Sequence, residues 1–173
     1  MTFPIVSYLL KVFLKKSQKL VLERHGRYLS FGDYVSDRWG KAKRLGFGEG
    51  TSVYDNVLIL GNVKVGCHTW IGPNCILDGS GGELVIGDYC SISAGVHIYT
   101  HNSVDWSLSE GDSAKAKKST IIGDYCYIGP NSIIAMGTKI ENKCIVGALS
   151  FVNGIHVHAG AKVFGIPAKI INY

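Results

Sequence analysis

The sequence predicts an all-β solenoid, a parallel β-helix built from repeats of six residues. Three observations support this fold class. A branched aliphatic residue recurs at every sixth position through most of the chain, a glycine or another short residue commonly follows it, and a small residue stands four positions after it. A hexapeptide period of this kind is the signature of a parallel β-helix.

The aliphatic residues define the first position of each repeat. They are Ile59, Val65, Ile71 and Leu77, then Ile86, Ile92 and Ile98, and after a long interruption Ile122, Ile128, Ile134, Ile140, Val146 and Val152. A narrow coil needs one branched side chain and one small side chain inside each repeat, because a second large group would clash there. A period of six excludes a continuous helix, whose period is 3.6 residues, and a β-sandwich would show alternation in twos.

Two segments precede the repeats. Residues 3–22 are expected to form an amphipathic helix, in which Phe3, Val6, Leu10 and Phe13 share one stripe. The helix is too short and too charged to cross a bilayer, and it lacks the pattern of a cleaved signal peptide. We expect it to pack on the coil or on a partner subunit, and the alternative is that it lies on a membrane surface.

The segment from residue 23 to about 49 mixes glycine and charge, and predicts an irregular connector. The predicted organisation is therefore a helix and connector over 1–48, followed by a β-helix domain over 49–171. The last residues of the coil are expected to be irregular, and His156 and His158 fall in that irregular turn.

The chain has 173 residues, of which 46% are hydrophobic, and a net charge of +5. It is long enough for one domain with a substantial core. The basic excess suits an anionic ligand, and no interleaved basic and aromatic motif predicts nucleic-acid binding. The cysteines at the small fifth position are interpreted as core fillers, not ligands or disulfides, and they indicate a reduced, cytoplasmic setting. These are Cys75, Cys90, Cys126 and Cys144.

The period breaks at two places. Asp78–Gly82 is a small insertion, and the polar stretch from about 101 to 120 contains no hexad. Long loops in a compact repeat are more often functional than not. Counting the hexads in threes assigns the outward sixth position to three sides, and both breaks are expected to emerge from the side that carries Lys64 and Lys139.

The other two sides are largely apolar on the outside as well as inside. One carries Trp70, Ser91, Tyr127 and Ile145, and the other carries Ile76, His97, Ile133 and Phe151. Exposed apolar stripes on a soluble coil usually mean burial against another chain.

The motif aliphatic-Gly-x-x-small-x resembles the left-handed β-helix of the hexapeptide-repeat acyltransferases, over roughly residues 57–168. The resemblance implies three hexads for each triangular turn and a homotrimer of parallel coils. The two apolar sides support the trimer independently. Cyclic symmetry would then place identical clefts between neighbouring chains.

The run Tyr99-Thr100-His101-Asn102 resembles the galactoside, maltose and xenobiotic acetyltransferase branch, where the catalytic histidine lies at the point where the loop leaves the coil. The resemblance implies that His101 is the general base; the alternative is a histidine that anchors the loop. A sugar hydroxyl is a poor nucleophile, and a base that removes its proton during attack typically contributes about 10²–10⁴-fold. Asn102, Asp105 and Trp106 are the candidate acceptor contacts, and Asp105 is the candidate for orienting the imidazole.

The C-terminal run Val163–Lys169 resembles the closing Gly-Asn-Pro-Ala-(Lys/Arg) motif of the same branch, with Ile166 in place of Asn. The resemblance implies that Lys169 approaches the phosphates of coenzyme A. It also implies that Ala148, Asn153 and Gly154 flank the pantetheine, although the usual Thr-Lys is missing there. Tyr127 fills the aromatic position that precedes Ile-Gly in many relatives.

Acetyl-coenzyme A is therefore the expected co-substrate, and no metal is expected. Because the repeat cysteines point inward, direct transfer without an acyl-enzyme is expected. The leading hypothesis is a sugar O-acetyltransferase of bacterial surface-polysaccharide biosynthesis, located in the cytoplasm or at the inner face of the membrane. The first alternative is an N-acetyltransferase for a nucleotide-linked amino sugar. A zinc-dependent β-helix similar to carbonic anhydrases, which needs three histidines at an interface, and a non-catalytic scaffold are the more distant alternatives.

Overall fold

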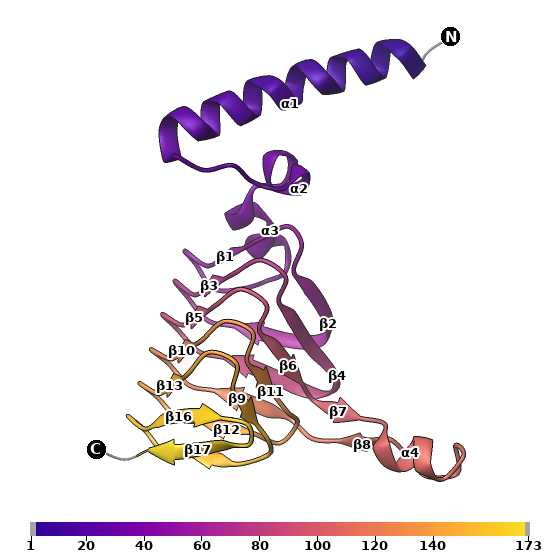
Figure 1. The fold of residues 1–173 in the computed structure, drawn as a ribbon, viewed down its shortest axis with the longest axis vertical. Coiled ribbons are helices and arrows are strands. Elements are labelled where there is room, and N and C mark those ends of the chain that lie inside the picture. The colour runs from indigo at the N-terminus through magenta and orange to yellow at the C-terminus, as the bar shows by residue number, and fades with distance from the viewer. Residues whose placement is uncertain (1–2, 172–173) are drawn as a thin grey trace.

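Figure 1 shows a tapering coil of parallel strands with helices at its N-terminal end. This computed structural model describes residues 3–171, and its coil is a parallel β-solenoid of about six turns. The predicted fold class is confirmed. Each turn crosses three sides, which we name the aromatic side, the isoleucine side and the lysine side.

The aromatic side stacks six parallel strands in the order β1-β3-β5-β10-β13-β16. Their bounds are Ser52–Val53 (β1), Trp70–Ile71 (β3), Ser91–Ile92 (β5), Tyr127–Ile128 (β10), Ile145–Val146 (β13) and Lys162–Gly165 (β16). The last strand, β17 (Ala168–Ile171), turns back antiparallel to β16 and covers the C-terminal end of this side.

The isoleucine and lysine sides share two long strands that turn the corner between them, β2 (Leu58–Val65) and β4 (Ile76–Ile86). The isoleucine side continues from β4 with β6 (His97–Tyr99), β11 (Ile133–Ile134) and β14 (Phe151–Val152). The lysine side continues with β9 (Thr120–Ile122), β12 (Lys139–Ile140) and β15 (His156–Val157).

The strand register confirms the predicted face assignment. Trp70, Ser91, Tyr127 and Ile145 are successive partners on one side, and Ile76, His97, Ile133 and Phe151 are successive partners on the next. The placement of the two breaks was wrong in detail. Asp78–Gly82 lies within β4, and the long excursion leaves from the same corner between the isoleucine and lysine sides.

The core consists of the predicted aliphatic column and the small fifth-position residues beside it. Ile71, Ile92, Ile98, Ile128 and Val146 all have no exposed surface. The small residues also donate hydrogen bonds to carbonyl groups of the next turn. Cys75 Sγ lies 3.0 Å from the Ser93 oxygen, Cys144 Sγ lies 3.1 Å from the His158 oxygen, and Thr69 Oγ1 lies 2.8 Å from the Gly87 oxygen. The fifth position thus requires a small side chain and, at most turns, one that can donate a hydrogen bond.

Burial raises the pKa of the Cys75 thiol to about 11 and also raises that of Cys144. Both thiols therefore stay protonated and unreactive. We expect Cys144→Ser to keep full activity while lowering the free energy of unfolding by about 1 kcal/mol, because a hydroxyl is costlier to bury but can still donate. Urea unfolding measures the loss, with Cys67→Ser as the half-buried control. Loss of activity in a folded Cys144→Ser protein would contradict the packing role.

Several corner residues adopt positive φ although they are not glycine. They include His68, Tyr89 and Tyr125, with φ between 53° and 59°. Such a conformation costs roughly 1–2 kcal/mol for a residue with a side chain. Here the three rings stack on one another from turn to turn, with centroids 4.8 and 5.7 Å apart. The stacking offsets part of the backbone strain.

The N-terminal region contains three helices, α1 (Phe3–His25), α2 (Phe31–Val35) and α3 (Arg38–Arg44). The expectation of an irregular connector was wrong, because α2 and α3 are too short to show a helical period in the sequence. They are fixed by local and tertiary contacts. Asp37 caps α3 by accepting the Gly40 N–H at 2.7 Å, and Lys41 Nζ donates to the carbonyl of Asp55 at 2.6 Å. Through the buried Ala42, α3 closes the first turn of the coil.

Candidate active site

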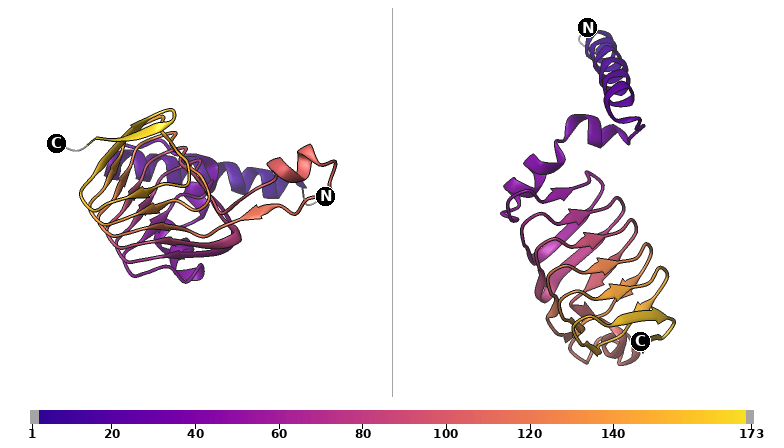
Figure 2. Two further views of the ribbon diagram at one scale, coloured as in Figure 1. Left: turned by 90° about the horizontal axis from the view of Figure 1, so that it is seen from below. Right: turned by 90° about the vertical axis from the view of Figure 1, so that its left-hand side faces the viewer.

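The long excursion is a two-stranded arm. Its base is β7 (His101–Asn102), which pairs antiparallel with β8 (Ala116–Lys117), and its tip carries the short helix α4 (Val104–Leu108). Figures 1 and 2 show the arm projecting sideways from the corner between the isoleucine and lysine sides. His101 is therefore the first residue of the arm, at the point where the chain leaves the coil.

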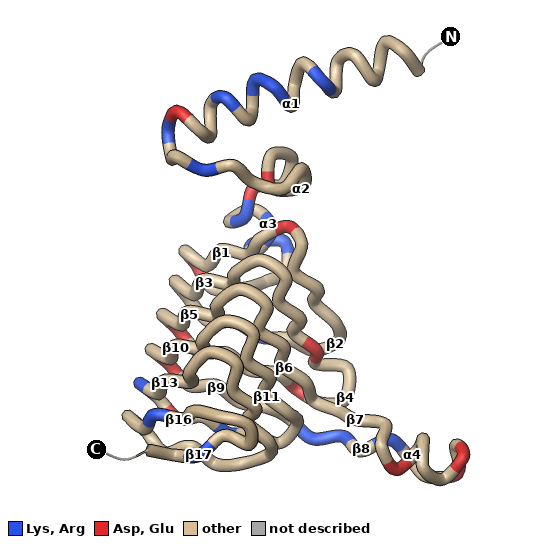
Figure 3. The backbone as a smooth tube through the Cα atoms, in the orientation of Figure 1, with Lys and Arg blue, Asp and Glu red and all other residues tan. Residues whose placement is uncertain are grey.

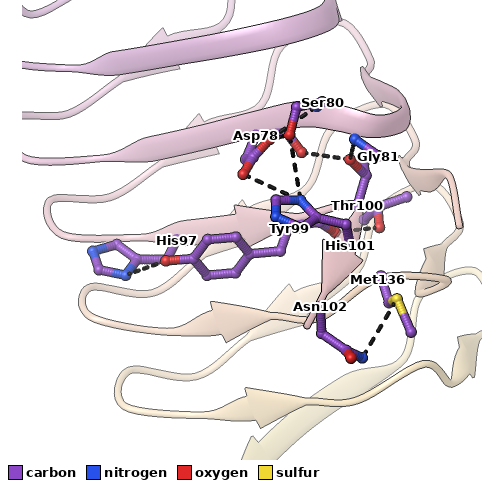
Figure 4. A network of polar contacts seen from close by, with 10 residues as sticks. Asp78, Ser80, Gly81, His97, Tyr99, Thr100, His101, Asn102 and Met136 are labelled. Atoms are coloured by element: carbon purple, nitrogen blue, oxygen red, sulfur yellow. Dashed lines mark hydrogen bonds and ion pairs between the residues drawn. The ribbon is translucent and has the colours of Figure 1, made fainter. Parts of the chain in front are cut away.

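A carboxylate and a hydroxyl from β4 face the His101 imidazole (Figure 4). His101 Nδ1 lies 3.4 Å from Asp78 Oδ2 and 3.3 Å from Ser80 Oγ. The His101 side chain is 30% exposed, whereas that of Asp78 is 6% exposed. The ring thus bridges a buried acid and the solvent.

Asp78 is fixed by its own neighbours. Its Oδ1 accepts the Ser80 N–H at 2.9 Å and the Ser80 hydroxyl at 2.6 Å. The Thr100 hydroxyl donates to the Asp78 carbonyl at 2.8 Å and accepts the Gly81 N–H at 3.0 Å. Gly81 has to lack a side chain, because a Cβ there would stand 2.4 Å from His101 Cβ. The insertion Asp78–Gly82 therefore forms the surface against which the imidazole packs.

This arrangement selects one tautomer of His101. A carboxylate beside Nδ1 favours a proton on that nitrogen and leaves Nε2 with a free lone pair. Among the described residues, none hydrogen-bonds to Nε2. His101 is accordingly placed to accept a proton at Nε2 from a bound molecule, with Asp78 beside Nδ1 to stabilise the resulting imidazolium.

The residue that orients the imidazole was not predicted. Asp105 was the candidate, but it is exposed on α4 at the tip of the arm, and Asp78 occupies the position beside His101. In the sequence, Asp78 occupies the second position of a hexad, where short residues are common. It therefore does not stand out as a functional residue. The signal that could have revealed it is its place at the first break, where a regular repeat would have glycine.

The other two candidate acceptor contacts lie on the arm. Asn102 Oδ1 accepts the Val104 N–H at 3.1 Å, and its Nδ2 lies 3.6 Å from Met136 Sδ on the next turn. Trp106 is 44% exposed, and Lys115 Nζ stands 5.4 Å above its ring. Asn102 thus ties the base of the arm to the coil, and Trp106 offers an exposed aromatic face near its tip.

A second histidine lies close by on the isoleucine side. His97 Nδ1 is 3.3 Å from the Tyr99 hydroxyl. Burial, with a smaller contribution from Asp78, raises the pKa of Tyr99. The phenol therefore remains a neutral hydrogen-bond donor, and His97 is engaged in the wall of the coil rather than free as a base.

The candidate coenzyme A contacts fall into two groups. Asn153 and Gly154 are exposed at the corner that also carries His101, and the Gly154 N–H donates to Thr138 Oγ1 at 3.0 Å. Tyr127 is 43% exposed on the aromatic side, Ala148 is exposed at the corner that follows it, and Lys169 is exposed on β17. In a single chain, the first group therefore shares a corner with His101 and the second group does not.

Within residues 3–171, one group of three side chains is arranged to hold a metal ion, and it comprises Glu141, His156 and His158. It lies at a different corner, between the lysine and aromatic sides, and includes neither His97 nor His101. Among residues 3–171, no three histidines of one chain lie close enough together to share a metal ion.

The repeats match the family model described as bacterial transferase hexapeptide (six repeats) over residues 119–154. Among curated proteins, the chain is 29% identical over 121 residues to carnitine operon protein CaiE of Proteus sp. strain LE138, and 28% identical over 123 residues to that of Escherichia coli strain K12. These alignments cover 68% and 69% of this chain, and 61% and 63% of the relatives. The chain thus matches about three fifths of the length of these relatives.

The solved structures that resemble this chain also include hexapeptide-repeat proteins. The hexapeptide-repeat-containing acetyltransferase VCA0836 of Vibrio cholerae, complexed with acetyl-coenzyme A, is 25% identical with a TM-score of 0.67, covering 94% of this chain and 87% of that one. Galactoside acetyltransferase in complex with coenzyme A also has a TM-score of 0.67, at 18% identity, covering 94% and 81%. The N-acyltransferase AntD of Bacillus cereus has a TM-score of 0.62 at 21% identity, covering 72% and 70%.

The fold and repeat identify the chain as a hexapeptide-repeat left-handed β-helix. Its similarity to acyltransferases of this class, predicted from the sequence, is confirmed, and galactoside acetyltransferase is among the structural relatives.

The contact between Asp78 and His101 leads to a specific prediction. In Asp78→Asn, the amide oxygen can still accept from Ser80, but the NH₂ group would face Nδ1 and hold the imidazole in the wrong tautomer. We expect a decrease of at least about tenfold in kcat with little change in KM. Adding the substitution to His101→Ala should cause no further decrease. A full additional loss in that double variant would show that Asp78 acts independently of His101.

Proposed function

We propose that this protein transfers an acetyl group from acetyl-coenzyme A to a hydroxyl of a sugar. The observation that carries the proposal is the imidazole of His101, backed by the buried Asp78 at 3.4 Å, at the base of an arm that can cover an acceptor. The similarity to acetyltransferases solved with acetyl-coenzyme A supports the identity of the donor.

The proposed reaction proceeds in two proton-coupled steps. His101 Nε2 removes the proton of the sugar hydroxyl while its oxygen attacks the thioester carbonyl. The resulting tetrahedral oxyanion needs a hydrogen-bond donor, which a backbone N–H can supply. Collapse breaks the carbon–sulfur bond, and the imidazolium returns its proton to the departing thiolate. The products are an O-acetyl sugar and free coenzyme A.

We also propose which residues contact coenzyme A. Lys169 would approach a coenzyme A phosphate, and Ala148 would border the pantetheine at the C-terminal end of the aromatic side. Asn153 and Gly154 would border the pantetheine at the corner that carries His101. Since one chain separates these two groups, we propose that coenzyme A binds between two chains of a homotrimer.

The outward residues of the coil support the trimer. Trp70, Tyr127, Ile133 and Ile145 are each between 36% and 43% exposed in the single chain. They lie on the aromatic and isoleucine sides, in register from turn to turn. Burial of apolar surface contributes about 25 cal/mol per Å², so that two such sides favour packing against neighbouring coils.

The acceptor is proposed to be a sugar of a bacterial surface polysaccharide, and Trp106 would stack against its ring. The test is product analysis. Purified protein would be incubated with acetyl-coenzyme A and a panel of glycans, nucleotide sugars and nucleotide-linked amino sugars, and products would be analysed by mass spectrometry and NMR. O-acetylation of a hydroxyl supports the proposal. Acetylation only of an amine would instead establish the N-acetyltransferase alternative.

Figure 1 shows helix α1 standing away from the coil, so the expected packing of α1 on the coil is not observed. We propose instead that α1 lies on the inner face of a membrane. None of its residues is buried, and Figure 3 shows basic residues from the middle of the helix to its C-terminal end. Phe3, Val6, Leu10 and Phe13 are each between 44% and 86% exposed. Within residues 3–171, no helix is long and apolar enough to cross a bilayer. Apolar and basic surface together favour an in-plane position on anionic lipid.

We expect the protein to float with vesicles that contain phosphatidylglycerol and to remain unbound with purely zwitterionic vesicles. Phe13→Asp should abolish flotation, because it places a charge in the apolar face, and high salt should weaken it. Leu45→Asp, an exposed apolar site outside α1, is the control and should float normally. Flotation of Phe13→Asp at the level of the unmodified protein would contradict the role of α1.

A further inference from the structure

The last turn of the lysine side departs from the repeat in a way that acyl transfer does not require. The residue after each aliphatic position on this side is Gly66, Gly87 and Gly123 in the earlier turns, but Glu141 and His158 in the last two. In the earlier turns a side chain would collide with the turn below. A Cβ on Gly123, for example, would lie 2.2 Å from Asn142 Oδ1.

The turn below Glu141 lacks the corner side chain that would collide with it. Asp88, Asp124 and Asn142 each accept a backbone N–H from the turn above, at 2.7 to 2.9 Å. At the next turn the equivalent residue is Ala159, whose side chain cannot accept a hydrogen bond. The contact is reversed there: Glu141 Oε2 accepts the Ala159 N–H at 3.0 Å. Glu141 is thereby held in place at the corner.

Two histidines join this carboxylate. His156 begins β15 and His158 directly follows its last residue, the buried Val157, so the two histidines are two positions apart along nearly extended chain. His156 Nε2 is 2.8 Å from Glu141 Oε1, and the two imidazole centroids are 4.5 Å apart. The sequence predicts an irregular turn here. The strand is regular, but the spacing from Val152 to Val157 is five residues, so the period slips by one.

We propose that Glu141, His156 and His158 form a binding site for a zinc-type divalent transition-metal ion. Imidazole nitrogens with one carboxylate oxygen are a ligand set that such ions favour and that Mg²⁺ does not. The three ligand atoms lie within 4.8 Å of one another. Bonds of about 2.0–2.2 Å require ligand atoms roughly 3.3 Å apart, which a rotation of the exposed His158 side chain can achieve.

The surroundings suit a partly open site. Both histidines are exposed, so that solvent can supply a water molecule as the fourth ligand. Lys139 lies next to His156 in the strand register, and its charge opposes a cation; the negative charge of Glu141 offsets it. The ion would join β12 to β15 and stabilise the last turn. The site is separate from His101, and the inference does not depend on the proposed function.

The test is a zinc titration in competition with a chromophoric chelator. We expect the unmodified protein to bind one equivalent of Zn²⁺ per chain, with micromolar or tighter affinity that excess Mg²⁺ does not change. His158→Ala and Glu141→Gln should each weaken binding by at least about tenfold. Glu141→Gln can still accept the Ala159 N–H, so that it preserves the fold. Zn²⁺ should raise the Tm of the unmodified protein and leave that of His158→Ala unchanged.

The matched control is His68→Ala, because His68 is a histidine that follows the half-buried Cys67 and so forms a pair of zinc-ligand residue types outside the proposed site. This variant should bind Zn²⁺ as the unmodified protein does. Absence of saturable binding, or binding that His68→Ala removes and His158→Ala leaves intact, would overturn the assignment.

Discussion

Replacing His101 by alanine should decrease kcat by at least about a hundredfold while the protein remains assembled and binds coenzyme A normally. The expectation follows from the free Nε2 and from Asp78, 3.4 Å from Nδ1. Removing the general base deprives the attacking hydroxyl of its proton acceptor, a loss typically of about 10²–10⁴-fold. Initial rates of thiol release give kcat, and calorimetric titration gives the affinity for coenzyme A.

His68→Ala is a suitable control, since that histidine is exposed and stacks on Tyr89 far from the arm. His97→Ala is a sharper comparison. It removes the contact to the Tyr99 hydroxyl but leaves His101 and Asp78 in place. We expect a much smaller decrease for His97→Ala. Full turnover in His101→Ala, combined with a large loss in His97→Ala, would reverse the catalytic assignment.

Phe151→Asp should dissociate the proposed trimer and abolish activity in the same preparation. Phe151 lies at the outward position of the isoleucine side, in register with the 39% exposed Ile133. A carboxylate at that position would be buried without a partner on assembly, which is strongly unfavourable. Since coenzyme A is proposed to bind between chains, loss of the trimer should remove both binding and turnover. Light scattering and the activity assay test the two consequences together.

Ile121→Asp is the matched control for this substitution. Ile121 occupies the same outward position on the lysine side and is 41% exposed. That side is not proposed to pack against another coil, so the variant should remain trimeric and active. A fully active Phe151→Asp monomer would contradict both the interface and the shared site.

The coil could be predicted from the sequence because its geometry repeats. Each inward aliphatic residue, such as Ile92 or Ile128, is fixed by the turns above and below it, and the period therefore assigns strands and sides together. The N-terminal connector could not be predicted in this way. Its helices α2 and α3 are short, and α3 depends on the Asp37 cap and on the contacts of Lys41 with the coil.

The candidate site was predictable only in part. His101 was found because a recognisable motif stands where the period breaks, and the structure places it at the base of the arm. Asp78 was missed because the two residues are far apart in sequence and meet only through the pairing of β4 with β6. Glu141, His156 and His158 were missed for a similar reason: their proximity depends on a one-residue slip between β14 and β15.

The central claim is that the corner bearing His101 transfers an acyl group from coenzyme A. The most direct measurement follows release of the coenzyme A thiol from acetyl-coenzyme A by the unmodified protein, with and without a mixture of sugar acceptors. The account predicts rapid release that requires an acceptor, with an equal amount of O-acetylated sugar formed. Absence of release with every hydroxyl and amine acceptor, by a trimer shown to be folded, would contradict it.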